Sequence, residues 1–302
     1  MAEIVGEPVE DHHLVDIITD PRLDWVGPEP RGIASVITPT AGRVYTIVED
    51  TKEGQQQNWD VYCLTAEKRV CSEFSDDGFA MYEFAFKELG FRFPFSDLAA
   101  GVFGWLKLAP SQLHPNSLAF IRAFEIVCEY LEDEPYLPLF FRIFKLQRQP
   151  SKSGHDWVSL KQQTKLFKMF VDSVSGFKER YYVVRPRTPS AKDSLYETTV
   201  VTEEDGSTRL DEDGRPVVRR IARFPLSWSE EHFATSTDSY LTKDEARSDG
   251  ERVGLAKLQS FVEKFEPARY VTRAGTPTLD SQGRSRVELR YINTKSLLEC
   301  NG

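Results

Sequence analysis

The 302-residue sequence has few cysteines, no excess of positive charge and no long apolar run, and each deficit excludes a class of protein. Its four cysteines, Cys63, Cys71, Cys128 and Cys300, are too scattered for a disulfide framework or a Cys-x-x-Cys zinc site. No apolar run approaches the roughly 20 residues of a membrane-spanning helix. The opening residues, MAEIVGEPVEDHH, lack the basic-then-apolar order of a secretory signal. These features predict an intracellular protein with reduced thiols, in the nucleus or the cytoplasm.

The net charge of −9 argues against a general nucleic-acid-binding protein, but the charge is unevenly distributed. Residues 140–189 hold eleven basic and three acidic side chains, a balance of +8, which leaves −17 for the remainder. Such asymmetry indicates either an anion-binding face or a solvated basic surface that pairs with acidic parts of the same chain. The residues that a nucleic-acid-binding surface here would use are Arg142, Lys145, Arg148, Trp157, Lys161, Lys165, Lys168, Lys178 and Arg180.

The same segment is rich in aromatic residues, which allows two interpretations. Aromatic rings beside lysines can stack on nucleotide bases. The spacing of these rings also fits strand alternation and helix faces, and this favours burial in the core over base stacking. The residues concerned are Trp157, Phe167, Phe170, Phe177, Tyr181 and Tyr182.

The stretch QLHPNSLAFIRAFEIVCE, residues 112–129, raises the question of whether His114 has a catalytic or a structural role. Pro115 suits a first helical turn because its torsion is preset and it lacks an N–H group. The side chain of His114 or Asn116 can accept a hydrogen bond from a free first-turn amide. No nucleophile or carboxylate partner is evident nearby, so the sequence favours a helix start over a catalytic histidine. The apolar stripe that follows comprises Phe120, Ile121, Phe124, Val127, Cys128 and Leu131, with Arg122, Glu125 and Glu129 on the opposite face.

Periodicity and turn residues predict the other elements of the first half. Residues 1–75 are acidic and irregular, and we expect a loosely ordered arm with strand-like runs at 42–49 and 59–65. A helix is expected over 78–90, after Ser75-Asp76-Asp77 and before Gly90. Ser96 is expected to cap a second helix, in which Leu98, Val102 and Trp105 line one face and which Pro110 closes.

The second half mixes strand and helix patterns. We expect helices over 137–147, 164–174 and 242–265, the last interrupted near 248–250. Strands are expected over 157–163, 177–186 and 286–292. Residues 199–222 contain two Asp-Gly turns between β-branched runs and predict a hairpin or meander. No internal repeat is predicted.

Three short motifs could carry chemistry, and each has a simpler interpretation. FSDD at 74–77 has the form of a polymerase metal site, but the amphipathic pattern behind it favours a helix N-terminus. DHHLVD at 11–16 places His12 and Asp16 at metal-ligand spacing within an acidic terminus. DEDG at 211–214 lacks the other ligands of a calcium loop. Gly-rich phosphate loops, nucleophile elbows, aspartic-protease signatures and zinc knuckles are absent from the sequence, so we expect no cofactor, no metal and no enzymatic activity.

Several blocks in order resemble a known family. They are FPFSDLAAGVFGWLKLAPSQLHPNSLAFIRAFEIVCEYL, LFFRIFKL, WVSLKQQ, FKERYYVV and FPLSW. Together they resemble the plant gypsy-type transposon domain, a retroelement-derived family, over roughly residues 78–235. The resemblance implies no established catalytic residues. The motif positions that it carries over are Gln112, Leu113, His114, Pro115 and Asn116, with Trp157, Phe177 and Trp228.

The sequence therefore predicts an α+β fold, a helical cluster followed by a smaller β-containing part. The expected divisions are an acidic arm at 1–75, a transposon-like domain at 76–235 (helical 76–147, β-containing 157–235) and a C-terminal helix with a turn-rich tail at 236–302. The expected function is a retroelement-derived, non-catalytic structural or interaction module, coat-like and self-associating. The alternatives are weak RNA or DNA binding by the basic segment 142–187 and, less favoured, a metal-dependent transposase or nuclease. No membrane partner is expected.

Overall fold

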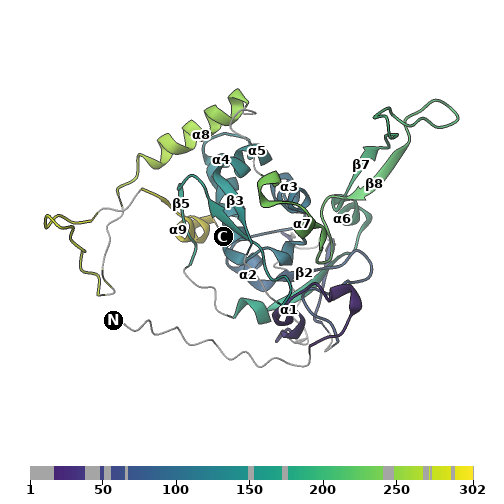
Figure 1. Ribbon diagram of the computed structural model, residues 1–302, viewed down its shortest axis with the longest axis horizontal. Coiled ribbons are helices and arrows are strands. Elements are labelled where there is room, and N and C mark those ends of the chain that lie inside the picture. The colour runs from purple at the N-terminus through teal and green to yellow at the C-terminus, as the bar shows by residue number, and fades with distance from the viewer. Residues whose placement is uncertain are drawn as a thin grey trace.

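The computed structural model describes residues 17–37, 48–50, 56–64, 67–148, 153–171, 176–240, 248–267, 272, 274–286 and 290–301. Helices and several small sheets form one body, from which a two-stranded hairpin projects (Figure 1). The mixture confirms the expected α+β fold. The N-terminal motif DHHLVD and most of the strand-like run at 42–49 lie outside the described residues.

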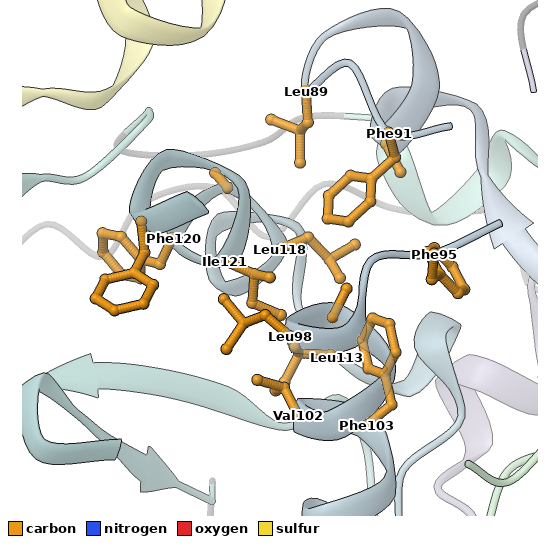
Figure 2. Packing of buried hydrophobic residues seen from close by; sticks show 14 of the residues in the cluster. Leu89, Phe91, Phe95, Leu98, Val102, Phe103, Leu113, Leu118, Phe120 and Ile121 are labelled. Atoms are coloured by element: carbon orange, nitrogen blue, oxygen red, sulfur yellow. The ribbon is translucent and has the colours of Figure 1, made fainter. Parts of the chain in front are cut away.

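The helical part is centred on α4 (Pro115–Tyr130), which α3 (Asp97–Leu106) and the short α2 (Glu83–Lys87) contact. Next along the chain comes α5 (Leu137–Ile143). Figure 2 shows side chains from α3, α4 and the segment before α3 meeting in one apolar cluster. Phe103, Phe124 and Leu118 are fully buried there, so this cluster is the principal core.

Four small sheets surround this core. The largest is antiparallel, with β6 (Tyr181–Pro186) between β1 (Trp59–Tyr62) and β2 (Phe79–Tyr82). The two-stranded sheets are β3 (Phe144–Gln147) with β4 (Ser159–Gln162), parallel β5 (Phe167–Lys168) with β9 (Ile292–Asn293), and β7 (Tyr196–Val200) with β8 (Val218–Ala222). Because β6 lies between two strands from before residue 83, segments far apart in the chain share one sheet.

The remaining elements are short helices at the periphery and two C-terminal helices. In Figure 1 α8 lies along the outside of the body, and α9 contacts α4. In chain order they are η1 (Pro21–Leu23), α1 (Pro28–Gly32), η3 (Pro110–Gln112), η4 (Phe177–Glu179), α6 (Pro189–Ser194), α7 (Glu231–Ala234), η5 (Thr237–Tyr240), α8 (Asp249–Val262) and α9 (Thr294–Asn301).

Several local predictions are confirmed. Ser96 caps α3, because its hydroxyl accepts a hydrogen bond from the backbone N–H of Ala99. The strands near 157–163 and 177–186 and the hairpin over 199–222 are present. Ser248 caps α8, which explains the interruption expected in that region.

Other local predictions are wrong because distant strands recruit the segment. Residues 79–82 were expected in a helix over 78–90, but they form β2, whose four residues all pair with β6. Phe167 and Lys168, expected in a helix, pair with Ile292 and Asn293 as β5 and β9. The helix expected over 137–147 ends at Ile143, and its last residues form β3. Part of the strand expected over 286–292 lies outside the described residues, and its last residue, Ile292, lies in β9.

Two predicted helix faces also need correction. Trp105 was expected on the buried face of α3 but is 50% exposed. Glu125 was expected on the polar face of α4 but is 7% exposed. The hydroxyl of Ser96 donates a hydrogen bond to its carboxylate, and Arg122 forms an ion pair with it at 3.0 Å. A buried carboxylate is tolerated at this position because both partners satisfy it.

Candidate interaction surfaces

His114 is a helix cap. Its ring nitrogen Nδ1 accepts a hydrogen bond of 3.2 Å from the backbone N–H of Asn116, and Pro115 opens α4. The ring lies edge-on to Phe177, with centroids 5.3 Å apart. Burial, together with the charge of Lys178, lowers the pKa of His114 to about 4. The imidazole is therefore neutral at ordinary pH, and the expected helix cap is confirmed.

The residues around His114 join the helical part to the later segments. The amide of Gln112 accepts a hydrogen bond from the backbone N–H of Ser229 and donates one to its carbonyl, each 3.1 Å long. The amide nitrogen of Asn116 donates to the carbonyl of Val171 at 2.9 Å. The indole of Trp228 donates to the hydroxyl of Ser111 at 3.1 Å. These motif positions are used for packing and capping.

The acidic pair in FSDD is paired with cations. Asp76 and Asp77 have positive φ angles of 56° and 59° in a turn that leads into β2, so the expected helix N-terminus is wrong. Asp76 forms an ion pair with Arg185 at 2.9 Å, and Asp77 forms one with Lys192 at 2.6 Å. Within the described ranges, no group of three or more His, Cys, Asp or Glu side chains is arranged to hold a metal ion.

Part of the expected basic face is used within the fold. The guanidinium of Arg148 donates to the carbonyls of His232 and Thr235 at 2.6 and 2.7 Å. Lys178 forms an ion pair with Glu29 at 2.5 Å, and Arg180 forms one with Glu83 at 2.6 Å. Arg142 is half-buried on α5.

Trp157 is only 8% exposed, and its indole donates a hydrogen bond of 2.5 Å to the hydroxyl of Tyr82. Its ring therefore has no open face for a base. The alternative interpretation, that the aromatic residues of this segment belong to the core, is confirmed for all six.

Four lysines of the expected face remain available. We call Lys145, Lys161, Lys165 and Lys168 the lysine group; all four are exposed. Their ammonium groups form no ion pair within the part of the chain that the structure describes. Lys145 and Lys161 are direct cross-strand partners in the antiparallel pairing of β3 with β4. Like charges placed opposite each other destabilise a strand pair, so an anionic partner would relieve this arrangement.

Gln162 keeps the loop that carries Lys165 closed. Its side-chain oxygen accepts hydrogen bonds from the backbone N–H groups of Leu166 and Phe167, at 3.0 and 2.9 Å, and its nitrogen donates to the carbonyl of Phe167 at 2.7 Å. The chain therefore turns back just after Lys161, and Lys168 follows in β5. Hydrogen bonds therefore hold the backbone at each position of the lysine group, in the β3–β4 pair, in β5 and in the loop between β4 and β5.

A second exposed feature is the hairpin of β7 and β8, residues 196–222, which we call the arm. It projects from the body at the upper right of Figure 1. Every residue from Thr202 to Pro216 is exposed. Val200 and Val218 are cross-strand partners near the middle of the arm, yet they are 43% and 57% exposed.

The tip of the arm, residues 203–213, is strongly acidic. Glu204, Glu212 and Asp213 make no ion pair or hydrogen bond through their carboxylates within the described part of the chain. Asp211 differs, since its carboxylate accepts hydrogen bonds from the backbone N–H groups of Asp213 and Arg215, both at 2.9 Å. DEDG is therefore a turn closed by its own aspartate. The carboxylates of the tip are Glu203, Glu204, Asp205, Asp211, Glu212 and Asp213.

The base of the arm is fixed to the body. Phe224, just after β8, is 2% exposed and packs against Phe95 and Phe103, with ring centroids 5.7 and 5.8 Å away. Arg223 forms an ion pair with Asp97 at 2.6 Å. Gly104 permits this approach, because a Cβ there would lie 2.1 Å from the carbonyl oxygen of Arg223. The exposed tip thus stands on an anchored base.

The turn at the tip occurs twice, which corrects the expectation of no internal repeat. The pattern Gly-Ser/Thr-x-x-Leu-Asp-x-x-Gly-Arg runs over 206–215 and again over 275–284. In both copies the aspartate, Asp211 or Asp280, accepts a hydrogen bond from the backbone N–H of the arginine four residues later, at 2.9 and 3.0 Å. The two copies lie at opposite ends of the long axis in Figure 1. The second copy carries Ser281 and Gln282 where the first has Glu212 and Asp213.

An apolar groove of about 550 Å³ lies between α4, α8 and α9. Its lining includes Tyr130, which is 73% exposed, and Phe265, which is 38% exposed. This groove was not anticipated from the sequence, because its walls come from three separated helices. None of the helices in the described part of the chain combines the length and apolar composition that a bilayer crossing requires.

Residues 81–148 match the model of the family described as "Putative gypsy type transposon". The matched segment runs from β2 to just beyond β3 and contains all of α4 with its His114 cap. It ends before the arm and includes only Lys145 of the lysine group. No curated protein and no solved structure matches the chain.

Proposed function

We propose that this chain, which carries a segment of the gypsy-type transposon family at residues 81–148, is a non-catalytic module that assembles with copies of itself. The observation that supports this most is the arm. It combines an anchored base, open backbone edges and an exposed pair of valines, Val200 and Val218. Exposed strands with apolar side chains are usually shielded in monomeric proteins, since they pair with other chains.

The chemistry of the described side chains agrees with a binding role. The carboxylates of Asp76, Asp77 and Glu125 are engaged by cations or hydroxyls of the fold. Burial lowers the pKa of His232 to about 4 and raises the pKa of the Cys128 thiol to about 12. A neutral buried imidazole and a protonated buried thiol are suited to packing.

Light scattering coupled to size-exclusion chromatography over a concentration series tests this proposal. The wild type is expected above its monomer mass, and Val200→Thr/Val218→Thr should shift the equilibrium toward monomer while it keeps β-branched side chains in both strands. Val253→Thr is the matched control, because Val253 is 58% exposed on α8. A wild type that stays monomeric at every concentration contradicts the proposal.

A second candidate function is weak, sequence-independent RNA or DNA binding by the lysine group. The observation that favours it is that four exposed lysines, two of which face each other, form no ion pair with any residue that the structure describes. Phosphate contacts release counterions, so retention on a filter should fall steeply as salt rises. Lys161→Glu/Lys165→Glu/Lys168→Glu should abolish retention, and the equal charge change Arg252→Glu/Lys257→Glu/Lys264→Glu on or beside α8 should not. Equal retention by the wild type and the first variant excludes this candidate.

A further inference from the structure

The acidic tip of the arm and the lysine group have opposite charge. Most of their charged side chains form no ion pair within the described part of the chain. The tip, residues 203–213, holds six carboxylates against one cation, Arg209. The lysine group presents four ammonium groups with no ion-pair partner in the described part of the chain. Complementary charge of this kind steers two surfaces together and fixes which surfaces meet.

The two surfaces of one copy do not meet each other. In Figure 1 the tip of the arm lies at the far upper right, whereas β3 and β5 lie within the body and toward its left side. The base of the arm is held by the buried ring of Phe224 and by the Arg223–Asp97 ion pair. An anchored base holds the tip away from the lysine group of its own chain, so a tip that reaches this group belongs to another copy.

We infer that the occupant of the lysine group is the acidic tip of the arm of a second copy. This inference rests on the proposed self-association and names the two surfaces that form it. A single such contact joins different patches on the two copies, so the joined pair still presents one free tip and one free lysine group. These two can bind each other, which closes a dimer, or they can bind further copies, which generates rings or open filaments.

The lysine group suits a protein arm better than a nucleic acid for two reasons. The aromatic rings nearest in sequence, Phe144 and Phe167, are buried, and so is Trp157. A long polyphosphate would extend beyond the four lysines along a chain whose net charge is −9, whereas the carboxylates of the tip are confined to residues 203–213. A carboxylate tip on a narrow hairpin can reach the lysines while the two bodies remain apart.

A charge exchange tests the inference. The first variant, Lys161→Glu/Lys165→Glu/Lys168→Glu, makes the lysine group acidic. The second, Glu204→Lys/Glu212→Lys/Asp213→Lys, makes the tip basic. Each alone should raise the dissociation constant at least about tenfold at low salt, because like charges then face each other. An equimolar mixture of the two variants should associate again, since an acidic lysine group then meets a basic tip.

The repeated turn supplies a variant that preserves the fold. Glu212→Ser/Asp213→Gln gives the tip the residues that the second copy of the turn carries at Ser281 and Gln282. The turn keeps Asp211, Gly214 and Arg215, so the hairpin should form as before while two free carboxylates are lost. Association should weaken in this variant, and its circular dichroism spectrum should match that of the wild type.

The outcomes separate this inference from the proposed function. If the wild type associates but both charge variants associate equally well, the inference is wrong and self-association stands through another surface. If the first variant loses RNA retention while its association is unchanged, the lysine group is a nucleic-acid site and the inference is wrong. If the wild type is monomeric throughout, both proposals are wrong.

Discussion

Lys145 and Lys161 stand directly opposite each other across β3 and β4, both exposed and both without an ion-pair partner among the described residues. The neighbouring pair in the same register, Leu146 and Leu160, is buried. The fold thus fixes the two lysines side by side, because the leucines must face the core. Repulsion between the two ammonium groups slightly lowers the stability of the free monomer, and a bound anion would offset this repulsion.

The cost can be measured with Lys145→Gln. Removal of one charge should raise the free energy of unfolding of the monomer by about 0.2–0.5 kcal/mol at low salt, since the repulsion between the facing ammonium groups is lost. The gain should disappear at high salt, where the pair is screened. Urea unfolding at two salt concentrations measures both values. A loss of stability above about 1 kcal/mol would show that Lys145 has a stabilising partner instead.

Phe124 is fully buried in α4, where its ring lies edge-on to Phe140 with centroids 5.5 Å apart. Phe124→Ala should lower the free energy of unfolding by about 3–5 kcal/mol, because the change removes buried apolar surface and leaves a cavity. Chemical denaturation measures this. A change below about 1 kcal/mol would mean that the stripe on α4 is not core.

The start of α4 separates the roles of two adjacent residues. His114→Asn should change the free energy of unfolding by less than about 1 kcal/mol, because asparagine is also a good cap. Pro115→Gly should lower it by about 1–2 kcal/mol, since glycine loses more backbone entropy on folding and suits a helix poorly. Thermal or urea unfolding compares the two. Loss of a measurable activity in His114→Asn, with unchanged stability, would contradict the assignment of His114 as a cap.

His114 and His232 should make the protein less stable as the pH falls. Burial lowers the pKa of each to about 4, against about 6.5 in the unfolded chain. Below pH 6.5 the unfolded state therefore binds protons that the folded state does not, and stability is lost as the pH drops toward 4. Between pH 7 and 5.5 each histidine should account for on the order of 1 kcal/mol.

His114→Asn removes one of these two groups, so it should lose about half as much stability over that range as the wild type. Urea unfolding at pH 7 and at pH 5.5 gives, for the wild type and the variant, the slope of the free energy of unfolding against pH. Identical slopes in the wild type and the variant would mean that His114 titrates in the folded protein as it does in the unfolded chain.

Local signals in the sequence predicted the parts of the fold that depend on neighbouring residues. The proline after His114 marks the start of α4, and Ser96 marks the start of α3. The Asp-Gly turns between β-branched runs predicted the hairpin that became the arm. In each case the determining residues lie within a few positions of the element.

The errors arose where a distant segment decided the structure. Residues 79–82 have an acceptable helical pattern, but β6, about a hundred residues later, supplies their strand partner. The availability of the lysines is similarly non-local, since Glu29 and Glu83 come from earlier elements to pair with Lys178 and Arg180. The repeated turn could have been found in the sequence, because its ten-residue pattern recurs at 275–284.

The most direct test of the account is the mass of the wild-type protein in solution as concentration and salt are varied. The monomer mass is 34.6 kDa. At low salt the weight-average mass should rise with concentration to at least twice that value, because the tip of one copy then occupies the lysine group of another. High salt should return it toward the monomer. A mass of 34.6 kDa under every condition would contradict self-association, and association that is equally strong at low and at high salt would contradict the joining of arm and lysine group between copies.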